Sequence, residues 1–301
     1  MSLTGLAFLL AFAAGLGMAL FRHPIYGLYT YVAVFYLHPP SRWWGETLPD
    51  LRWSLVAAVV TVIATMRLSN DESRPSWIST TPAKLIIAFT VWVWIQNIWA
   101  LDADDHLDAS ILFTKYIALF YVMYRILDTP EKITSFFVTH VAGCLYLGWL
   151  AFNATFSGRL EGVGGPGINE ANALAMQMGT GIAVGAMLIL GSKGWQKWLC
   201  FIAMPFALNT LVLASSRGAF LSMFAAGIAL WVLKPRAHRT MFYVYATLGV
   251  ILAVSLTHEA FWERMQTITV AAEHTEEADT SAQSRVALVK AQTRMAMHYP
   301  M

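Results

Sequence analysis

Charged residues are scarce in this sequence. They make up 13% of its 301 residues, whereas a soluble domain carries about a quarter. With 57% of the residues hydrophobic, this deficit excludes an ordinary soluble domain, and the net charge of +2 gives no basis for nucleic-acid binding. The two cysteines, Cys144 and Cys200, both lie inside apolar runs. We therefore expect small core residues there rather than a disulfide or a metal pair.

The common signatures of soluble catalysis are also absent. The sequence contains no Walker loop, no Rossmann fingerprint, no zinc-ligand spacing and no nucleophile elbow. No cofactor and no metal site is therefore predicted. The segment LDADDHLDA (101–109) holds four aspartates. Because charge runs are usually solvated, we interpret this segment as an external loop rather than as a divalent-cation site.

Apolar runs long enough to cross a bilayer are abundant. The first, Leu3–Leu20, is uncharged and is about as long as the hydrocarbon core requires. A signal peptide is the rival interpretation, disfavoured because no basic segment precedes the run and further runs follow. Hydrocarbon offers no partner for unpaired backbone groups, so every span must be helical. The sequence predicts an all-α, polytopic transmembrane helical bundle of about ten spans. They lie near residues 3–21, 24–38, 52–66, 83–100, 109–126, 133–152, 172–190, 195–214, 217–233 and 240–257.

The lysines and arginines of the short connections predict the orientation. Eleven lie in one set of connections and four, Arg42, Arg52, Arg159 and Arg217, lie in the opposite set. Basic residues concentrate on the cytoplasmic side, so the smaller set faces outward. With ten spans, the N-terminus, the loop 153–171 and the tail 258–301 also lie outside. If one short span is absent, the N-terminus changes side whereas the later loops do not.

A full positive charge lies on the short hinge of LVLASSRGAFLSM (212–224). Arg217 either extends to lipid headgroups from an interfacial position or binds a phosphate or pyrophosphate. The next helix is predicted to begin here, with Gly218 permitting a tight turn. A helix N-terminus beside a guanidinium is a suitable anion site.

The loop within SGRLEGVGGPGINEANALAMQM (157–178) is rich in glycine and in polar side chains. Composition alone favours a flexible external loop. However, Arg159, Glu170 and Asn172 belong to a group of polar residues that suits a sugar ligand with hydroxyls to bind. Asn172 is also predicted as the N-cap of the helix that follows.

Lys115 is a charge inside the predicted span 109–126, about two turns from its external end. An intramembrane charge is a candidate functional residue, and the flexible lysine side chain is able to reach a lipid phosphate. Extension to the interface without a specific ligand is the alternative, and the sequence favours neither.

The tail carries basic residues on an apolar background. Residues 280–284 are interpreted as a turn, and Ser281 or Ser284 is the predicted cap of a helix that runs to about Met297. This helix either lies at the membrane interface or directs Arg285 toward the same external cavity as Arg217.

Several of these segments together resemble a known family. SSRGAFLSMFAAGIAL is preceded by GGPGINEANALAMQM and followed by FWERMQTI and SAQSRVALVKAQTRMAMHYPM. These segments resemble the bacterial O-antigen ligase and polymerase superfamily. Together with the N-terminal HPIYGLYTYVAVFYLHPP, they are most similar to the O-glycosylation ligases associated with exosortase A systems.

This resemblance implies a glycosyltransferase of the bacterial inner membrane, active on its periplasmic face. Such enzymes move a glycan from an undecaprenyl diphosphate carrier to a protein, lipid or glycan acceptor, in a metal-independent inverting transfer. Arg217 and Arg285 occupy the positions of the diphosphate-binding arginines. Lys115, Arg159, Glu170 and Asn172 are the candidate substrate-binding residues. The implied partners are the lipid-linked donor, the acceptor and the bilayer.

The resemblance also implies a division of the chain. Residues 1–150 form an N-terminal transmembrane region, 151–257 an O-antigen ligase-like core, and 258–301 the incomplete start of a large periplasmic loop. Family members continue beyond HYPM with a histidine proposed as the base, so we expect a truncated chain whose own turnover is in doubt. A polysaccharide polymerase, a lipid-linked glycan transporter and a non-catalytic membrane subunit remain alternatives.

Overall fold

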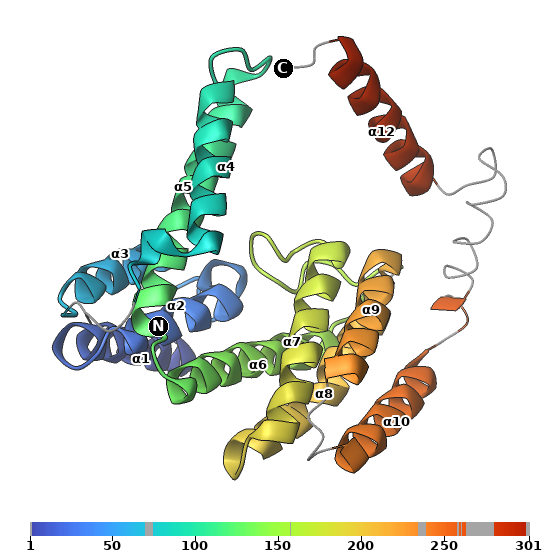
Figure 1. Ribbon diagram of the computed structural model, residues 1–301. Helices are drawn as coiled ribbons and strands as arrows, with labels where there is room; N and C mark the ends of the chain where they lie inside the picture. Colours follow the sequence, from blue (N-terminus) through green and yellow to red (C-terminus); the bar gives the residue numbers. More distant parts are fainter. Residues whose placement is uncertain are drawn as a thin grey trace. The chain divides into compact units, whose positions relative to one another are not determined.

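The computed structural model describes residues 2–69, 75–156, 158–233, 239–257, 259, 261–262 and 280–298. Within these ranges the regular structure is helical and contains no strand, which confirms the all-α prediction. The chain divides into two compact units, Met1–Gly143 and Cys144–Met301, and the boundary falls inside one helix. The α-helices are α1 (Leu3–Phe21), α2 (Ile25–Leu37), α3 (Trp53–Met66), α4 (Thr81–Gln96), α5 (Ala103–Ile126), α6 (Pro130–Asn153), α7 (Ala171–Gly191), α8 (Trp195–Leu213), α9 (Arg217–Leu233), α10 (Arg239–Leu256) and α12 (Thr280–His298) (Figure 1).

Each of the ten predicted spans corresponds to a helix from α1 to α10, most of them with ends within three residues of the prediction. Six helices, α1, α5, α6, α7, α8 and α10, are long and apolar enough to cross a membrane, which supports a multi-pass membrane protein. Three others, α3, α4 and α9, are apolar but shorter. The number of ten spans therefore stays a prediction, and so does the orientation derived from it.

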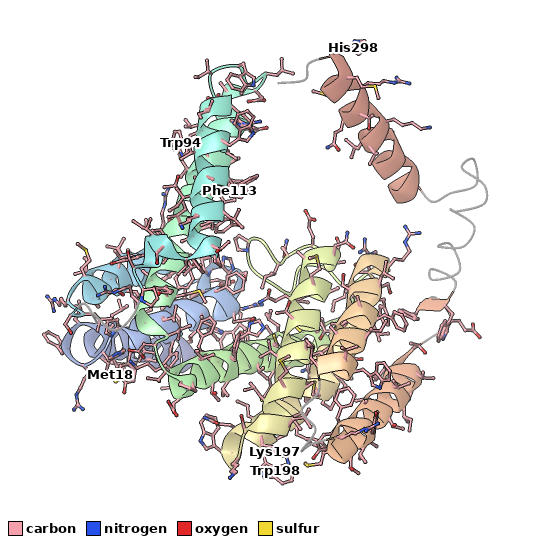
Figure 2. The ribbon with its side chains drawn as sticks, viewed as in Figure 1. Met18, Trp94, Phe113, Lys197, Trp198 and His298 are labelled. Atoms are coloured by element: carbon pink, nitrogen blue, oxygen red, sulfur yellow. The ribbon has the colours of Figure 1, made fainter. Side chains whose placement is uncertain are left out.

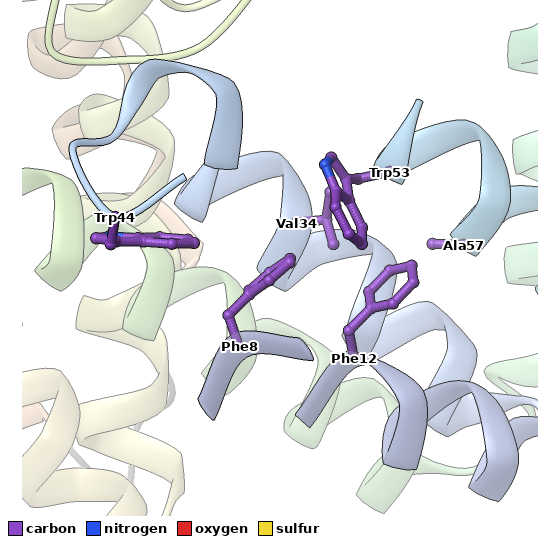
Figure 3. Packing of buried hydrophobic residues seen from close by; sticks show 6 residues of the cluster. All are labelled: Phe8, Phe12, Val34, Trp44, Trp53 and Ala57. Atoms are coloured by element: carbon purple, nitrogen blue, oxygen red, sulfur yellow. The ribbon is translucent and has the colours of Figure 1, made fainter. Parts of the chain in front are cut away.

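In the first unit, α1, α2 and α3 pack against one another. Their aromatic core contains Phe8, Phe12 and Trp53, and Phe12 meets Trp53 edge-on with 5.1 Å between ring centroids (Figure 3). The helices approach closely at small residues, because a Cβ added to Gly15 of α1 would lie 2.1 Å from Thr30 Oγ1 of α2. Small residues at such contacts are typical of membrane helix pairs.

Helices α4 and α5 form an antiparallel pair in the same unit. The Trp94 indole donates to Thr114 Oγ1 at 2.9 Å, and Phe89 meets Phe113 with ring centroids 5.0 Å apart. Figure 2 labels Trp94 of α4 and Phe113 of α5. The prediction of an external loop over 101–109 is wrong, because α5 begins at Ala103. Asp102 caps this helix by accepting from the Asp105 N–H at 3.1 Å. The aspartates of the first turn also stabilise the positive end of the helix dipole, so a charge run that suggested a loop starts a helix instead.

A hydrogen bond between α2 and α6 completes the core of this unit. Tyr36 Oη lies 2.6 Å from His140 Nδ1, and the Tyr36 ring is buried. A Cβ at Gly143 would lie 2.1 Å from this ring. Glycine is therefore required at this position of α6.

In the second unit, α7 packs against both α8 and α9, and α10 packs against α8. Both cysteines are buried, as predicted, and each lies in a helix: Cys144 in α6 and Cys200 in α8.

In the tail, the predicted turn over 280–284 is wrong, because α12 already begins at Thr280 and includes both serines. Ala282 and Gln283 favour helix, and here that preference outweighs the tendency of serine to form turns.

Candidate functional site

The chain reverses direction between α8 and α9 over three residues, Ala214 to Ser216. Ser215 has a φ of +47°, in the left-handed region. Its N–H and its hydroxyl both donate to the Val212 carbonyl, at 2.9 and 3.1 Å. The sequence placed the turn residue at Gly218, which instead lies in the first turn of α9 without a positive φ. A serine takes this role because its hydroxyl provides a local hydrogen bond that offsets the left-handed backbone.

Helix α9 begins at Arg217, as predicted, and Ser216 caps it. The Ala219 N–H donates to Ser216 Oγ at 3.4 Å, and the Phe220 N–H donates to the Ser216 carbonyl at 3.1 Å. Among the described residues, the Gly218 N–H has no acceptor. Arg217, the residue before Gly218 in the chain, is partly exposed. The first turn of α9 therefore offers a backbone donor, a helix dipole and a guanidinium at one place, which is the chemistry that binds a phosphate.

Asn172 joins three segments of the chain. Its Oδ1 accepts from Arg159 Nη2 at 2.8 Å and from Ser216 Oγ at 2.9 Å. Arg159 in turn donates through Nε to the Ala214 carbonyl at 3.2 Å. The loop before α7, the first turn of α7 and the hinge are thus held together by side-chain hydrogen bonds.

The prediction of Asn172 as the N-cap of α7 is wrong. Glu170 occupies the capping position without a capping side-chain bond, and Asn172 is the second residue of the helix. Its side chain instead extends to the hinge, where its amide oxygen accepts hydrogen bonds from both Arg159 and Ser216. The structure shows no acceptor for Nδ2 of Asn172 among the residues it describes. This amide group is therefore a donor available to a ligand.

The loop before α7 is packed rather than merely flexible. Leu160, Val163 and Ile168 are buried, and the Leu160 N–H donates to the Leu213 carbonyl at 3.2 Å. A Cβ at Gly164 would lie 2.2 Å from the Ile168 carbonyl oxygen, so a glycine is needed where the loop folds on itself. Beneath the polar residues, small side chains let α7 approach the hinge; these are Ala171, Ala175, Ala214 and Ala219.

The structure brings together only part of the predicted site. Arg159, Asn172 and the hinge that carries Arg217 are joined, and Glu170 lies exposed at the start of α7. Arg285 lies in α12, but its side chain is outside the described residues, so its approach to Arg217 stays a prediction. Lys115 belongs to the other unit. Sequence reasoning missed Ser216 as a cap and as a partner of Asn172, although a serine directly before a helix was a usable signal.

Comparison with known proteins identifies the region that contains this hinge. Residues 201–301 match the family model described as O-Antigen ligase. The match covers about a third of the 301 residues, and this part of the chain is similar to the O-antigen ligase family. This matched region includes most of α8, the hinge with Arg217, α9, α10 and α12. At the level of the family, this match supports a membrane glycosyltransferase of ligase or polymerase type. No curated protein and no solved structure matches the chain.

Proposed function

We propose that this protein transfers a glycan from an undecaprenyl diphosphate carrier to a protein, lipid or glycan acceptor on the periplasmic face of the inner membrane, without a metal. The observation that carries the proposal is the hinge of the O-antigen ligase domain. There, Arg217 starts a capped helix with a backbone donor beside it. The polar loop is fixed to the same hinge through Asn172.

In this proposal the anomeric carbon of the donor sugar exchanges one oxygen for another. An acceptor hydroxyl oxygen attacks the carbon from the opposite face and forms the new glycosidic bond, while the bond to the diphosphate oxygen breaks. The proton of the hydroxyl passes to the departing diphosphate or to water. The electron pair of that bond remains on the departing undecaprenyl diphosphate. Arg217 and the Gly218 N–H stabilise this developing negative charge, and the capped start of α9 holds this backbone donor in place before the reaction begins. Arginine suits the role because its planar fork matches phosphate oxygens and keeps its charge.

The neighbouring residues position the donor. Arg159 is fixed by the Ala214 carbonyl and by Asn172, so it presents its charge at a defined place. The Asn172 amide group and the exposed Glu170 carboxylate supply a donor and an acceptor for sugar hydroxyls. Arg285 is proposed as a second diphosphate contact from α12. A ligase and a polymerase share this donor chemistry and differ in the acceptor, and the similarity to exosortase-associated ligases favours a ligase.

The test uses the intact gene in a strain that lacks it. We expect Arg217→Lys to keep its charge but to lose bidentate binding, with a loss of product of roughly 100-fold. Surface glycan or glycoprotein and accumulated lipid-linked donor are measured together, at equal membrane levels of each variant. Arg239→Lys is the matched control, because Arg239 stacks on Tyr243 at the start of α10.

The side on which the donor accumulates separates the alternatives. Donor held on the periplasmic side supports the transferase, whereas donor held on the cytoplasmic side identifies a transporter. Normal transfer by Arg217→Lys would contradict the bidentate diphosphate contact. A normal amount of product from Arg217→Ala would show that Arg217 is an interfacial residue and does not bind the donor.

A further inference from the structure

The unit Met1–Gly143 contains a cavity of about 620 Å³. Its volume lies within the range of roughly 300–1,000 Å³ found for small-molecule sites. Residues of α2, α3 and α5 form its apolar walls, among them Leu28, Val62, Leu119 and Val122. All of the lining residues belong to this one unit. The cavity is therefore a property of the N-terminal helices and lies outside residues 201–301, which match the O-antigen ligase family.

Two cations line this apolar cavity, Lys115 of α5 and Arg52 directly before α3. Across the part of the chain that the structure describes, neither side chain has a hydrogen-bond or ion-pair partner. Asp50 lines the same cavity and is not paired with either of them. Both residues are exposed in the isolated chain. In a bilayer, a cation beside an apolar wall is costly unless an anion accompanies it.

His38 is the histidine of the cavity lining, and its charge state also affects the total charge of the cavity. Its Nδ1 lies 2.8 Å from Ser41 Oγ. Burial, and then the charge of Arg42, lower the pKa of His38, so the imidazole is neutral at neutral pH. The charged groups of the lining are thus two cations and one carboxylate. Their sum, a single positive charge, matches a phosphodiester better than a diphosphate.

We propose that this cavity binds an anionic phospholipid, whose phosphodiester contacts Lys115 and Arg52 and whose acyl chain lies against the apolar walls. The site requires none of the hinge residues, and so it goes beyond the proposed glycosyl transfer. It gives Lys115 a partner inside the membrane, since a lysine at this depth is expected to serve a ligand. Two polar rings of the lining, Tyr31 and Tyr116, provide further hydroxyl donors for the headgroup.

The test measures lipid binding by the full-length protein in a neutral detergent. The probes are phosphatidylglycerol, phosphatidylcholine, undecaprenyl diphosphate and inorganic phosphate, and native mass spectrometry gives the affinities. We expect phosphatidylglycerol to bind best and the double variant Lys115→Ala/Arg52→Ala to bind it about 10-fold more weakly, equivalent to about 1.4 kcal/mol. Lys84→Ala is the matched control, because Lys84 is exposed in α4 of the same unit and does not line the cavity.

Asp50→Asn provides a change of the opposite sign. It removes the negative charge of the lining, so we expect phosphatidylglycerol to bind several-fold more tightly. Unchanged affinity in both the double variant and Asp50→Asn would overturn the site. Stronger binding of undecaprenyl diphosphate than of phosphatidylglycerol would assign the cavity to the donor instead. Competition by inorganic phosphate alone would overturn the role of the acyl chain. Arg217→Ala should keep phosphatidylglycerol binding, which separates this proposal from the proposed function.

Discussion

The two units hold their positive charges in different ways. In the second unit, Arg159 donates to the Ala214 carbonyl and to Asn172, so its guanidinium is fixed before any ligand arrives. In the first unit, Lys115 and Arg52 line a cavity without a partner among the described residues. Fixed charges suit the stabilisation of a transition state, because no reorganisation is needed during the reaction. Adjustable charges suit the retention of a lipid headgroup. The difference is the one expected if the hinge serves the proposed glycan transfer and the cavity the proposed lipid binding.

The largest effect is expected where the fixed arrangement is broken. Asn172→Leu removes the oxygen that accepts from both Arg159 and Ser216 while keeping a similar volume. We expect roughly a 100-fold loss of glycan transfer, the scale found when a preorganised catalytic contact is removed. Phosphatidylglycerol binding should not change. The measurement is product formation in membranes. Asn153→Leu is the control, because the hydrogen bond that the structure shows for the Asn153 side chain is to the Trp149 carbonyl of its own helix. Equal activity in the two variants would remove the distinction between the units.

A smaller effect is expected from the core of the first unit. Gly143→Ala places a Cβ against the buried Tyr36 ring, and overpacking of this kind costs about 1–3 kcal/mol. We expect a lower Tm in detergent. Gly17→Ala is the matched control, because nothing lies within 4 Å of a Cβ at Gly17 of α1. A Tm for Gly143→Ala that equals that of the control would mean that α2 and α6 do not pack as described.

The smallest effect is a pH dependence at the connection between α1 and α2. Burial and then the charge of Lys132 lower the pKa of His23, and Asp128 opposes them. The folded protein therefore binds a proton at His23 less readily than the unfolded chain does. Its stability is expected to fall as the pH drops below the ordinary value of 6.5 toward the lowered pKa.

The check is the Tm in detergent between about pH 8 and pH 5.5, across the ordinary histidine pKa. His23→Gln should show a shallower loss on acidification than the wild type. Parallel curves of Tm against pH for the two proteins would show that protonation of His23 does not cause the loss of stability. The hinge of the second unit contains no histidine among its described residues, so variants there should leave the slope unchanged.

The sequence was sufficient for the helices from α1 to α10 because each contains an apolar run. It also placed the start of α9 at Arg217, where the short polar hinge separates two apolar runs. It was insufficient at 101–109, because aspartates are equally compatible with a loop and with the first turn of a helix. The role of Asn172 was also out of reach, since its partner Ser216 lies 44 residues away along the chain. Contacts of that separation depend on how α7 and α9 pack, and a single sequence does not encode this in any local pattern.

The left-handed conformation of Ser215 also limits how this segment can vary during evolution. Glycine adopts a φ of +47° without strain, and asparagine or aspartate adopts it at small cost. A β-branched residue such as valine or threonine does not. Ser215 is buried as well, so a bulky replacement would also lack space. Related sequences that keep this chain reversal should therefore vary at position 215 only among a few small residues, whatever glycan or acceptor they use.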